Sequence, residues 1–244
     1  MKICLSAKPL TLTNIDENGK RIRDAMREAR TGGAELILFG EASLSGFEAL
    51  TFDYERDIRR CLGISGPELA RLRDVARDIG IGVGVGFYEN YKGGIYSTYA
   101  VIDAEGDIRE IYRRVSPGWK REDACADYRD GDEFHAFRYG DKLFGLMICG
   151  DFWEEDLLPA LIELDPVVDA FLWPVHCDYT VRKWQSGEAD EYRARTAIMA
   201  KPVLFINNYV DAEDRAKGGL YHWCRGRTLD KLPMGETGLL YIDL

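Results

Sequence analysis

The sequence predicts an α/β fold with mixed β-sheets, and three observations carry that prediction. Apolar, strand-like runs alternate with segments of helical spacing along most of the 244 residues. Two pairs of runs flank short polar turns, which is typical of β-hairpins and argues against a purely doubly wound sheet. No linker, low-complexity segment or long repeat interrupts the chain. We therefore expect one domain that spans residues 1–244.

The first half of the chain supplies three predicted strands, two helices and a hairpin. Ile22, Met26 and Ala29 recur at helical spacing, and Gly32-Gly33 ends that helix. Residues 66–80 predict a second helix, with Pro67 in its first turn. The predicted strands are residues 2–10, 34–41 and 81–90, and the hairpin covers 95–115. The glycines of the third strand follow a strand-like period with no helix after them, so they do not form a dinucleotide-binding fingerprint.

The second half repeats the pattern. Residues 133–149 predict another hairpin, which ends in Cys149. Helices are predicted over 154–165 and 187–200, strands over 169–175 and 202–210, and a final β element over 228–244.

Composition excludes several classes of function. The net charge of −10 argues against a nucleic-acid partner, because such binding needs a basic surface. No apolar run is long enough to span a membrane, and the N-terminal segment lacks a signal-peptide pattern, so we expect a cytoplasmic protein. The six cysteines have no zinc-type or C-x-x-C spacing and are predicted to be reduced thiols. No P-loop or carboxylate cluster occurs, so we expect neither a cofactor nor a metal.

Three stretches place chemical groups at the ends of predicted strands, where ligands gather in α/β sheets. Glu41 follows the run "LILFG", and it is either a surface acid or a functional carboxylate. Cys149 ends "LFGLMIC"; a buried packing thiol is the common alternative to a nucleophile. The following Gly150 allows close approach of a ligand. The charged segment "IYRRVSPGWKRED" between the hairpins is either a solvated loop or a functional one.

Taken together, these stretches resemble the nitrilase, or carbon–nitrogen hydrolase, superfamily. That family has a strand that ends in a catalytic glutamate, a Tyr-Arg-Lys segment, and a strand that ends in a nucleophilic cysteine. The corresponding stretches here are "LILFGEASLSGF", "IYRRVSPGW" and "LFGLMICGDFWEED". The segments "YRDGDEF", with Asp130 where proline is usual, and "EYRARTAIMAKPVLFINN" extend the resemblance over nearly the whole chain.

The resemblance implies a four-layer α-β-β-α sandwich with two mixed β-sheets. It implies that Glu41 is the general base, that Cys149 is the nucleophile, and that the backbone N–H of Gly150 helps to bind the oxyanion. Arg114 stands where the family has its catalytic lysine. Arg114 could supply the positive charge itself, Lys120 could replace it from the loop, or the site could be weakened.

Further residues follow from the same resemblance. Glu122, eight residues after Arg114, suits the family's second glutamate. Trp153 is expected near the mouth of the site and, because "CGDFW" is similar to glutamine-hydrolysing members, hints at an amide substrate. His176 is either a pocket residue or a hydrogen-bonded loop histidine.

The implied function is cofactor-independent hydrolysis of a small carboxamide or carbamoyl compound through a thioester on Cys149. The family habit predicts a homodimer or larger homo-oligomer. Two alternatives stay open: acyl transfer from the same thioester, and a non-catalytic binding or scaffold protein in which Arg114 has ended catalysis. A flavodoxin-like module is disfavoured because no glycine-rich turn follows the first strand.

Overall fold

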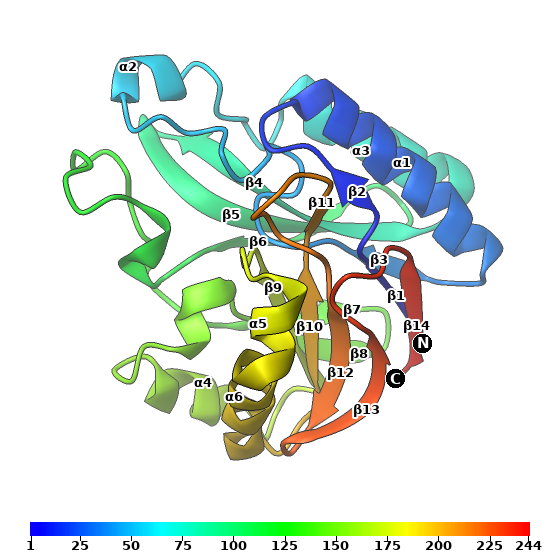
Figure 1. Cartoon of the computed structure of the whole chain (residues 1–244). Coiled ribbons are helices and arrows are strands. Elements are labelled where there is room, and N and C mark those ends of the chain that lie inside the picture. Colours follow the sequence, from blue (N-terminus) through cyan, green and yellow to red (C-terminus); the bar gives the residue numbers. More distant parts are fainter.

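The computed structural model describes residues 1–244 as two six-stranded β-sheets between layers of helices (Figure 1). The first sheet has the strand order β14-β1-β3-β4-β5-β6, and the second has the order β13-β12-β10-β9-β8-β7. In each sheet three neighbouring strands are parallel and the others are antiparallel. The mixed sheets confirm the expectation drawn from the hairpins.

The first sheet contains both ends of the chain. Its strands are β1 (Lys2–Ser6), β3 (Leu36–Leu38), β4 (Gly82–Tyr91), β5 (Gly94–Ile102), β6 (Ile108–Arg113) and β14 (Leu239–Asp243). Helices α1 (Ile15–Thr31) and α3 (Pro67–Ile79) cover its outer face. The Asn14 side chain accepts the N–H of Glu17 at the start of α1. Gly80, with φ +68°, ends α3 in the left-handed conformation that glycine adopts without strain.

The second sheet packs its outer face against the later helices. Its strands are β7 (Ala136–Tyr139), β8 (Lys142–Leu146), β9 (Ala170–Val175), β10 (Val203–Asn207), β12 (Leu220–Cys224) and β13 (Arg227–Leu232). Helices α4 (Leu158–Leu164) and α6 (Ala189–Arg195) lie on that face with α5 (Val181–Lys183) (Figure 1). The aromatic side chains of Trp173, Trp184 and Phe205 dominate the core between the sheet and these helices.

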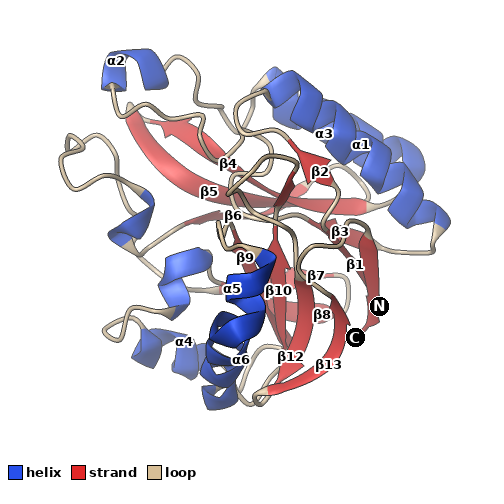
Figure 2. Cartoon of the chain, viewed as in Figure 1, coloured by secondary structure: helices blue, strands red, loops and turns tan.

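The inner faces of the two sheets enclose a separate core. Leu5, Leu38 and Tyr99 from the first sheet pack there with Phe144 and Leu172 from the second. Helix, sheet, sheet and helix therefore form four layers, which confirms the predicted sandwich (Figure 2).

The remaining elements are short. They are β2 (Pro9–Leu10) and β11 (Tyr209–Val210), which pair in parallel; α2 (Tyr54–Asp57); the 3-10 turns η1 (Pro117–Trp119), η2 (Cys149–Phe152) and η4 (Thr196–Ile198); and a π-helical turn, η3 (Trp184–Glu188). No helix is long and apolar enough to cross a membrane.

The C-terminal segment departs from the prediction. Residues 228–244 were expected to form one β element, but they supply β13 to the second sheet and β14 to the first. Pro233 and the positive-φ Gly235 and Gly238 turn the chain between the two sheets. Strand β12 was missed, because its sequence "LYHWC" gave no clear alternation to single it out.

Candidate active site

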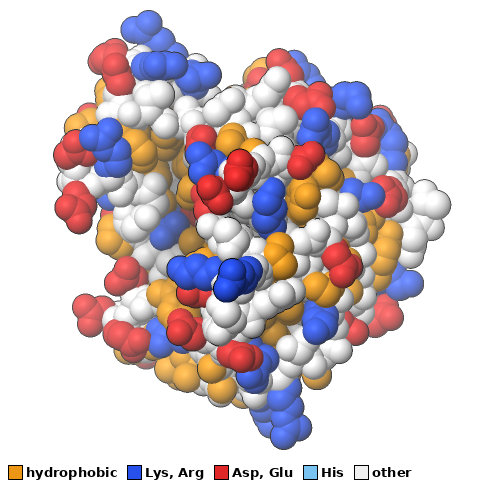
Figure 3. Space-filling view, viewed as in Figure 1, with side chains coloured by type: hydrophobic (Ala, Val, Ile, Leu, Met, Phe, Trp, Pro, Cys, Tyr) orange, Lys and Arg blue, Asp and Glu red, His pale blue; other side chains and the backbone are white.

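Glu41, Arg114 and Cys149 are brought together where strands of the two sheets end. Glu41 follows β3 and Arg114 follows β6, both in the first sheet, whereas Cys149 follows β8 in the second. Figure 3 shows a hollow at the left edge of the molecule, between the part that carries α2 with the loop after β6 and the part that carries α4. The candidate site therefore lies at the junction between the sheets.

The Glu41 carboxylate is buried, with 1% of its side chain exposed. Its Oε1 atom accepts hydrogen bonds from Arg114 Nη1 at 2.9 Å and from Ser97 Oγ at 3.1 Å. The other oxygen, Oε2, has no partner in the protein. A buried carboxylate with one oxygen fixed and one unpaired has a free acceptor for a proton.

The backbone of Glu41 is fixed by the second sheet. Its N–H donates to the carbonyl of Val175 at 3.2 Å, and its carbonyl accepts from Asn208 Nδ2 at 2.6 Å. Gly40 makes this contact possible, because a Cβ atom there would lie 2.6 Å from Asn208 Oδ1 and from the Val175 carbonyl. Gly86 in β4 likewise leaves room for the turn after Glu41, where a Cβ would lie 2.3 Å from the N atom of Ala42.

Cys149 adopts a backbone conformation that is unusual for a residue with a side chain. Its φ angle is +46°, in the left-handed region, and it opens the one-turn helix η2. The carbonyl of Cys149 accepts a hydrogen bond from Trp173 Nε1 at 2.9 Å. Residues held in sparsely populated conformations are concentrated at functional sites, and here the surrounding bonds hold the conformation in place.

Asp151 fixes the Cys149 turn to the segment that carries Arg114. Its fully buried carboxylate accepts from the N–H of Ile148 at 2.8 Å and of Ser116 at 2.7 Å, and from the hydroxyl of Tyr112 at 2.6 Å. Burial raises the pKa of Asp151, although the nearby Arg114 cation and these hydrogen bonds oppose the shift. Asp151 was not among the residues predicted from the sequence, although the "CGD" motif contains it.

Arg114 occupies the centre of the site, with only 4% of its side chain exposed. Besides its contact with Glu41, its Nε donates to Ser116 Oγ at 2.8 Å. Burial acts to lower the pKa of Arg114, but its electrostatic interactions with Glu41, Cys149 and Asp151 outweigh burial and hold that pKa above its ordinary value. The guanidinium is therefore a fixed cation next to both predicted catalytic groups.

The two other charged candidates lie away from this centre. Lys120 Nζ is bound to the Asp130 carboxylate and donates to the Tyr128 carbonyl at 3.2 Å. Glu122 is exposed on the loop after η1 and makes neither a hydrogen bond nor an ion pair within the chain. The structure thus brings Arg114, and neither Lys120 nor Glu122, into contact with Glu41.

Aromatic side chains and a second thiol lie beside Cys149. Trp153 is 37% exposed, and its ring centroid lies 4.9 Å from that of Tyr192. Cys177 Sγ lies 3.4 Å from the Tyr192 hydroxyl. Interaction with the Cys149 thiol, together with burial, raises the pKa of Cys177 well above its ordinary value. Sequence reasoning missed Cys177 and Tyr192, because only the packing of η2 and α6 against the second sheet brings them near Cys149.

His176 lies behind Glu41. Its Nδ1 is 3.2 Å from Asn208 Nδ2, its Nε2 is 3.1 Å from Asp178 Oδ1, and its ring stacks on Phe47 at 4.0 Å. Asn208 Nδ2 is a donor, so Nδ1 accepts and Nε2 carries the proton. Nδ1 thereby holds Asn208, and through it the backbone of Glu41, while the bond from Nε2 to Asp178 orients the ring.

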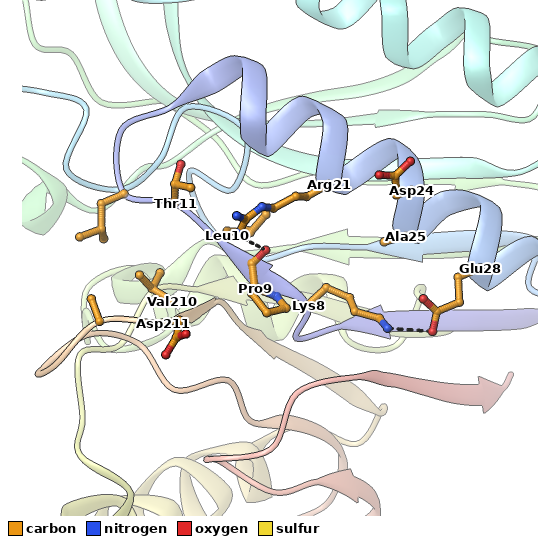
Figure 4. Close-up of a pocket in the computed structure, with 12 residues that line it drawn as sticks. Lys8, Pro9, Leu10, Thr11, Arg21, Asp24, Ala25, Glu28, Val210 and Asp211 are labelled. Carbon is orange, nitrogen blue, oxygen red and sulfur yellow. Dashed lines mark hydrogen bonds and ion pairs between the residues drawn. The ribbon is translucent and has the colours of Figure 1, made fainter.

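A large cavity of the molecule lies elsewhere. It has a volume of about 770 Å³ and opens between α1 and the paired strands β2 and β11 (Figure 4). Lys8, Leu10, Arg21 and Val210 are among its lining residues, and none of Glu41, Arg114 and Cys149 lines it. No group of three or more His, Cys, Asp or Glu side chains is placed to hold a metal ion.

Comparison with known proteins identifies the family. Residues 5–214 match the model of the carbon-nitrogen hydrolase family. This chain therefore belongs to the carbon–nitrogen hydrolase family, as its motifs implied.

Curated relatives include glutamine-dependent NAD(+) synthetase from Acinetobacter baylyi, at 24% identity over 67% of this chain and 29% of that protein. N-carbamoylputrescine amidase from Arabidopsis thaliana is 27% identical over 61% of this chain and 50% of that protein. The chain thus spans half or less of these relatives.

Solved structures share the fold. Glutamine-dependent NAD+ synthetase from Acinetobacter baumannii has a TM-score of 0.80 at 21% identity, covering 98% of this chain and 44% of that one. An amidase from Nesterenkonia sp. AN1 has a TM-score of 0.77 at 20% identity, covering 100% of this chain and 92% of that one.

Proposed function

We propose that this chain hydrolyses a C–N bond other than a peptide bond, in a small carboxamide or carbamoyl compound, through a thioester on Cys149. The observation that carries the proposal is the buried contact of Arg114 with Glu41 beside Cys149. Cys149 beside this pair has a φ angle of +46°, an unfavourable conformation that a purely structural ion pair would not require. Family membership supports the same reaction class.

In the proposed reaction, the Cys149 sulfur attacks the carbonyl carbon of the substrate as a thiolate. Glu41 takes the thiol proton, and its unpaired Oε2 is the oxygen that is free to do so. The carbonyl π electrons move onto oxygen, and the resulting oxyanion accepts hydrogen bonds from Arg114 and from the Gly150 N–H. The C–N bond then breaks, the amine leaves with the proton from Glu41, and a thioester remains.

The second half of the reaction regenerates the enzyme. Water attacks the thioester carbon while Glu41 accepts a proton from it. The C–S bond breaks, the acid or carbamate product leaves, and the proton returns to the Cys149 sulfur. Acyl transfer would follow the same path with an amine or another acceptor in place of water.

The arginine is compatible with this chemistry. Its Nη1 atom is used by Glu41 and its Nε atom by Ser116, which leaves Nη2 available as a donor. A guanidinium keeps its charge when buried. One of its nitrogens can donate to a carboxylate while another donates to an oxyanion. This arrangement favours an enzyme over a non-catalytic scaffold.

The decisive experiment is intact-protein mass spectrometry after incubation with a panel of small amides and carbamoyl compounds. We expect an acyl adduct on the wild-type protein, none on Cys149→Ala, and an unchanged adduct on Cys125→Ala, since Cys125 is an exposed thiol outside the site. The mass of the adduct identifies the acyl group. Absence of both adduct and turnover across the panel would favour the binding-protein alternative.

The homodimer or larger homo-oligomer, the cytoplasmic location and the catalytic role of Glu122 remain predictions. Light scattering tests the first. A Glu122→Gln variant with unchanged turnover would remove Glu122 from the mechanism.

A further inference from the structure

The third nitrogen of the Arg114 guanidinium is packed against a glycine. Nη2 has no hydrogen-bond partner within the chain, in contrast to Nη1 and Nε. A Cβ atom at Gly150 would lie 2.3 Å from Nη2, 3.4 Å from Cζ and 3.1 Å from Ser116 Oγ. Real Cβ contacts essentially never fall below 3.0 Å, so any larger residue at 150 would displace the guanidinium.

A second glycine flanks the same nitrogen without crowding it. A Cβ at Gly118 would lie 3.4 Å from Nη2, which is an ordinary van der Waals distance. Gly150 does not have the positive φ that would itself require glycine. Glycine at position 150 is therefore required because it leaves room for the Arg114 side chain, and not because of its backbone conformation.

We propose that Gly150 is a positioning residue that allows an arginine to act at position 114. The inference rests on the proposed function. A guanidinium is wider than an ammonium group, and its second terminal nitrogen must have space to lie beside the nucleophile. The Gly150 N–H makes no hydrogen bond within the chain either. Nη2 and this N–H are thus two free donors next to Cys149, and the absence of a Cβ at 150 places them together as an oxyanion site.

The test is a cycle of four proteins: wild type, Gly150→Ala, Arg114→Lys and the double variant. In the arginine background, we expect Gly150→Ala to lower kcat about 100-fold, the scale of a lost oxyanion donor, with KM changed by less than about 3-fold. In the lysine background, the same alanine should lower kcat by less than about 3-fold, since no Nη2 remains to be displaced. Gly118→Ala is the matched control and should stay within about 2-fold of wild type.

A second readout does not depend on turnover. Arg114 Nη2 packs against Gly150, the next residue after Cys149, and a nearby cation favours the reactive thiolate form of a cysteine. Displacement of the guanidinium in Gly150→Ala should slow the alkylation of Cys149 by iodoacetamide about 10-fold relative to wild type. In the lysine background, the double variant should be alkylated at the same rate as Arg114→Lys. Thermal unfolding of all five proteins establishes that each is folded. If the wild type turns over no amide, the proposed function fails, while the alkylation rates still test the positioning role of Gly150.

Equal losses from Gly150→Ala in the arginine and lysine backgrounds, in kcat and in alkylation, would overturn the inference. So would a Gly118→Ala variant that loses as much as Gly150→Ala, because the 2.3 Å contact would then not be the cause.

Discussion

The buried pair of Glu41 and Arg114 makes a quantitative prediction about stability. The two side chains are 1% and 4% exposed, and Glu41 Oε1 lies 2.9 Å from Arg114 Nη1. We consider three variants: Glu41→Gln, Arg114→Met and the double variant. Each single change leaves one buried group without its partner, whereas the double change removes both charges together.

The magnitude follows from the geometry. At 2.9 Å and an effective dielectric constant of ~20, the attraction between unit charges is ~6 kcal/mol. The cost of burying both ions offsets much of this, but removal of one partner leaves the other desolvated and costs about 3–5 kcal/mol. With an unfolding entropy of about 2.1 cal/mol/K per residue for a chain of this length, each single variant should lose about 6–10 °C in Tm.

Thermal unfolding followed by circular dichroism measures these shifts. The double variant should be at least as stable as the better single variant, because neither charge remains buried alone. Glu17→Gln is the control, since Glu17 forms an exposed pair with Arg21 at 2.6 Å that should be worth about 2 °C or less. If Glu41→Gln loses no more than Glu17→Gln, or if the two single losses simply add, the reasoning about the buried pair is wrong.

Three further predictions concern other buried or titrating groups. Asp151→Asn should lower the free energy of unfolding by about 2–4 kcal/mol, because an amide cannot accept all the hydrogen bonds of the carboxylate. This corresponds to a fall of about 4–8 °C in Tm, and a smaller fall would contradict the conclusion that Asp151 fixes the Cys149 turn. The hydrogen bond with Glu110 raises the pKa of His135, so the stability it adds is present below about pH 6.5 and is lost as the pH rises through the raised pKa. The difference in Tm between wild type and His135→Gln should therefore shrink from pH 6 to pH 9, and a constant difference would refute this. Burial and the Asp57 charge raise the pKa of Cys61 to about 12, so at pH 8 iodoacetamide should label exposed Cys125 well before Cys61, as peptide mapping would reveal.

Local patterns were sufficient for most of the fold. The helical spacing of Ile22, Met26 and Ala29 identified α1, and all three side chains are buried in its contact with the first sheet. The polar turns at 103–107 and 139–142 identified the hairpins β5–β6 and β7–β8. The C-terminal segment was different, because its two strands pair with partners in different sheets, and local alternation contains no information about which sheet a strand joins.

The same limit applies to the site. Glu41, Cys149 and Gly150 could be proposed from strand ends and motifs, because each follows an apolar run directly. Their supports could not: Asn208 is 167 residues from Glu41 in the sequence, and Asp151 is 35 residues from Ser116. The sequence also left Arg114 and Lys120 as competing sources of positive charge. Only packing shows that Lys120 is bound to Asp130 whereas Arg114 contacts Glu41, and this geometry favours Arg114.

Because the site lies at the junction of the two sheets, the hydrogen bonds that hold its residues in place also connect the sheets. Glu41 follows β3 of the first sheet, but its carbonyl accepts from Asn208, which follows β10 of the second. In the opposite direction, Asp151 lies in the turn after β8 of the second sheet and accepts from Tyr112 in β6 and from Ser116 in the loop after β6. Relative movement of the sheets would therefore shift Glu41 and the Cys149 turn against each other and break both sets of buried bonds. Because unpaired buried groups are costly, these bonds resist such movement and hold Glu41 and the Cys149 turn in a fixed relative position, as the proposed reaction requires.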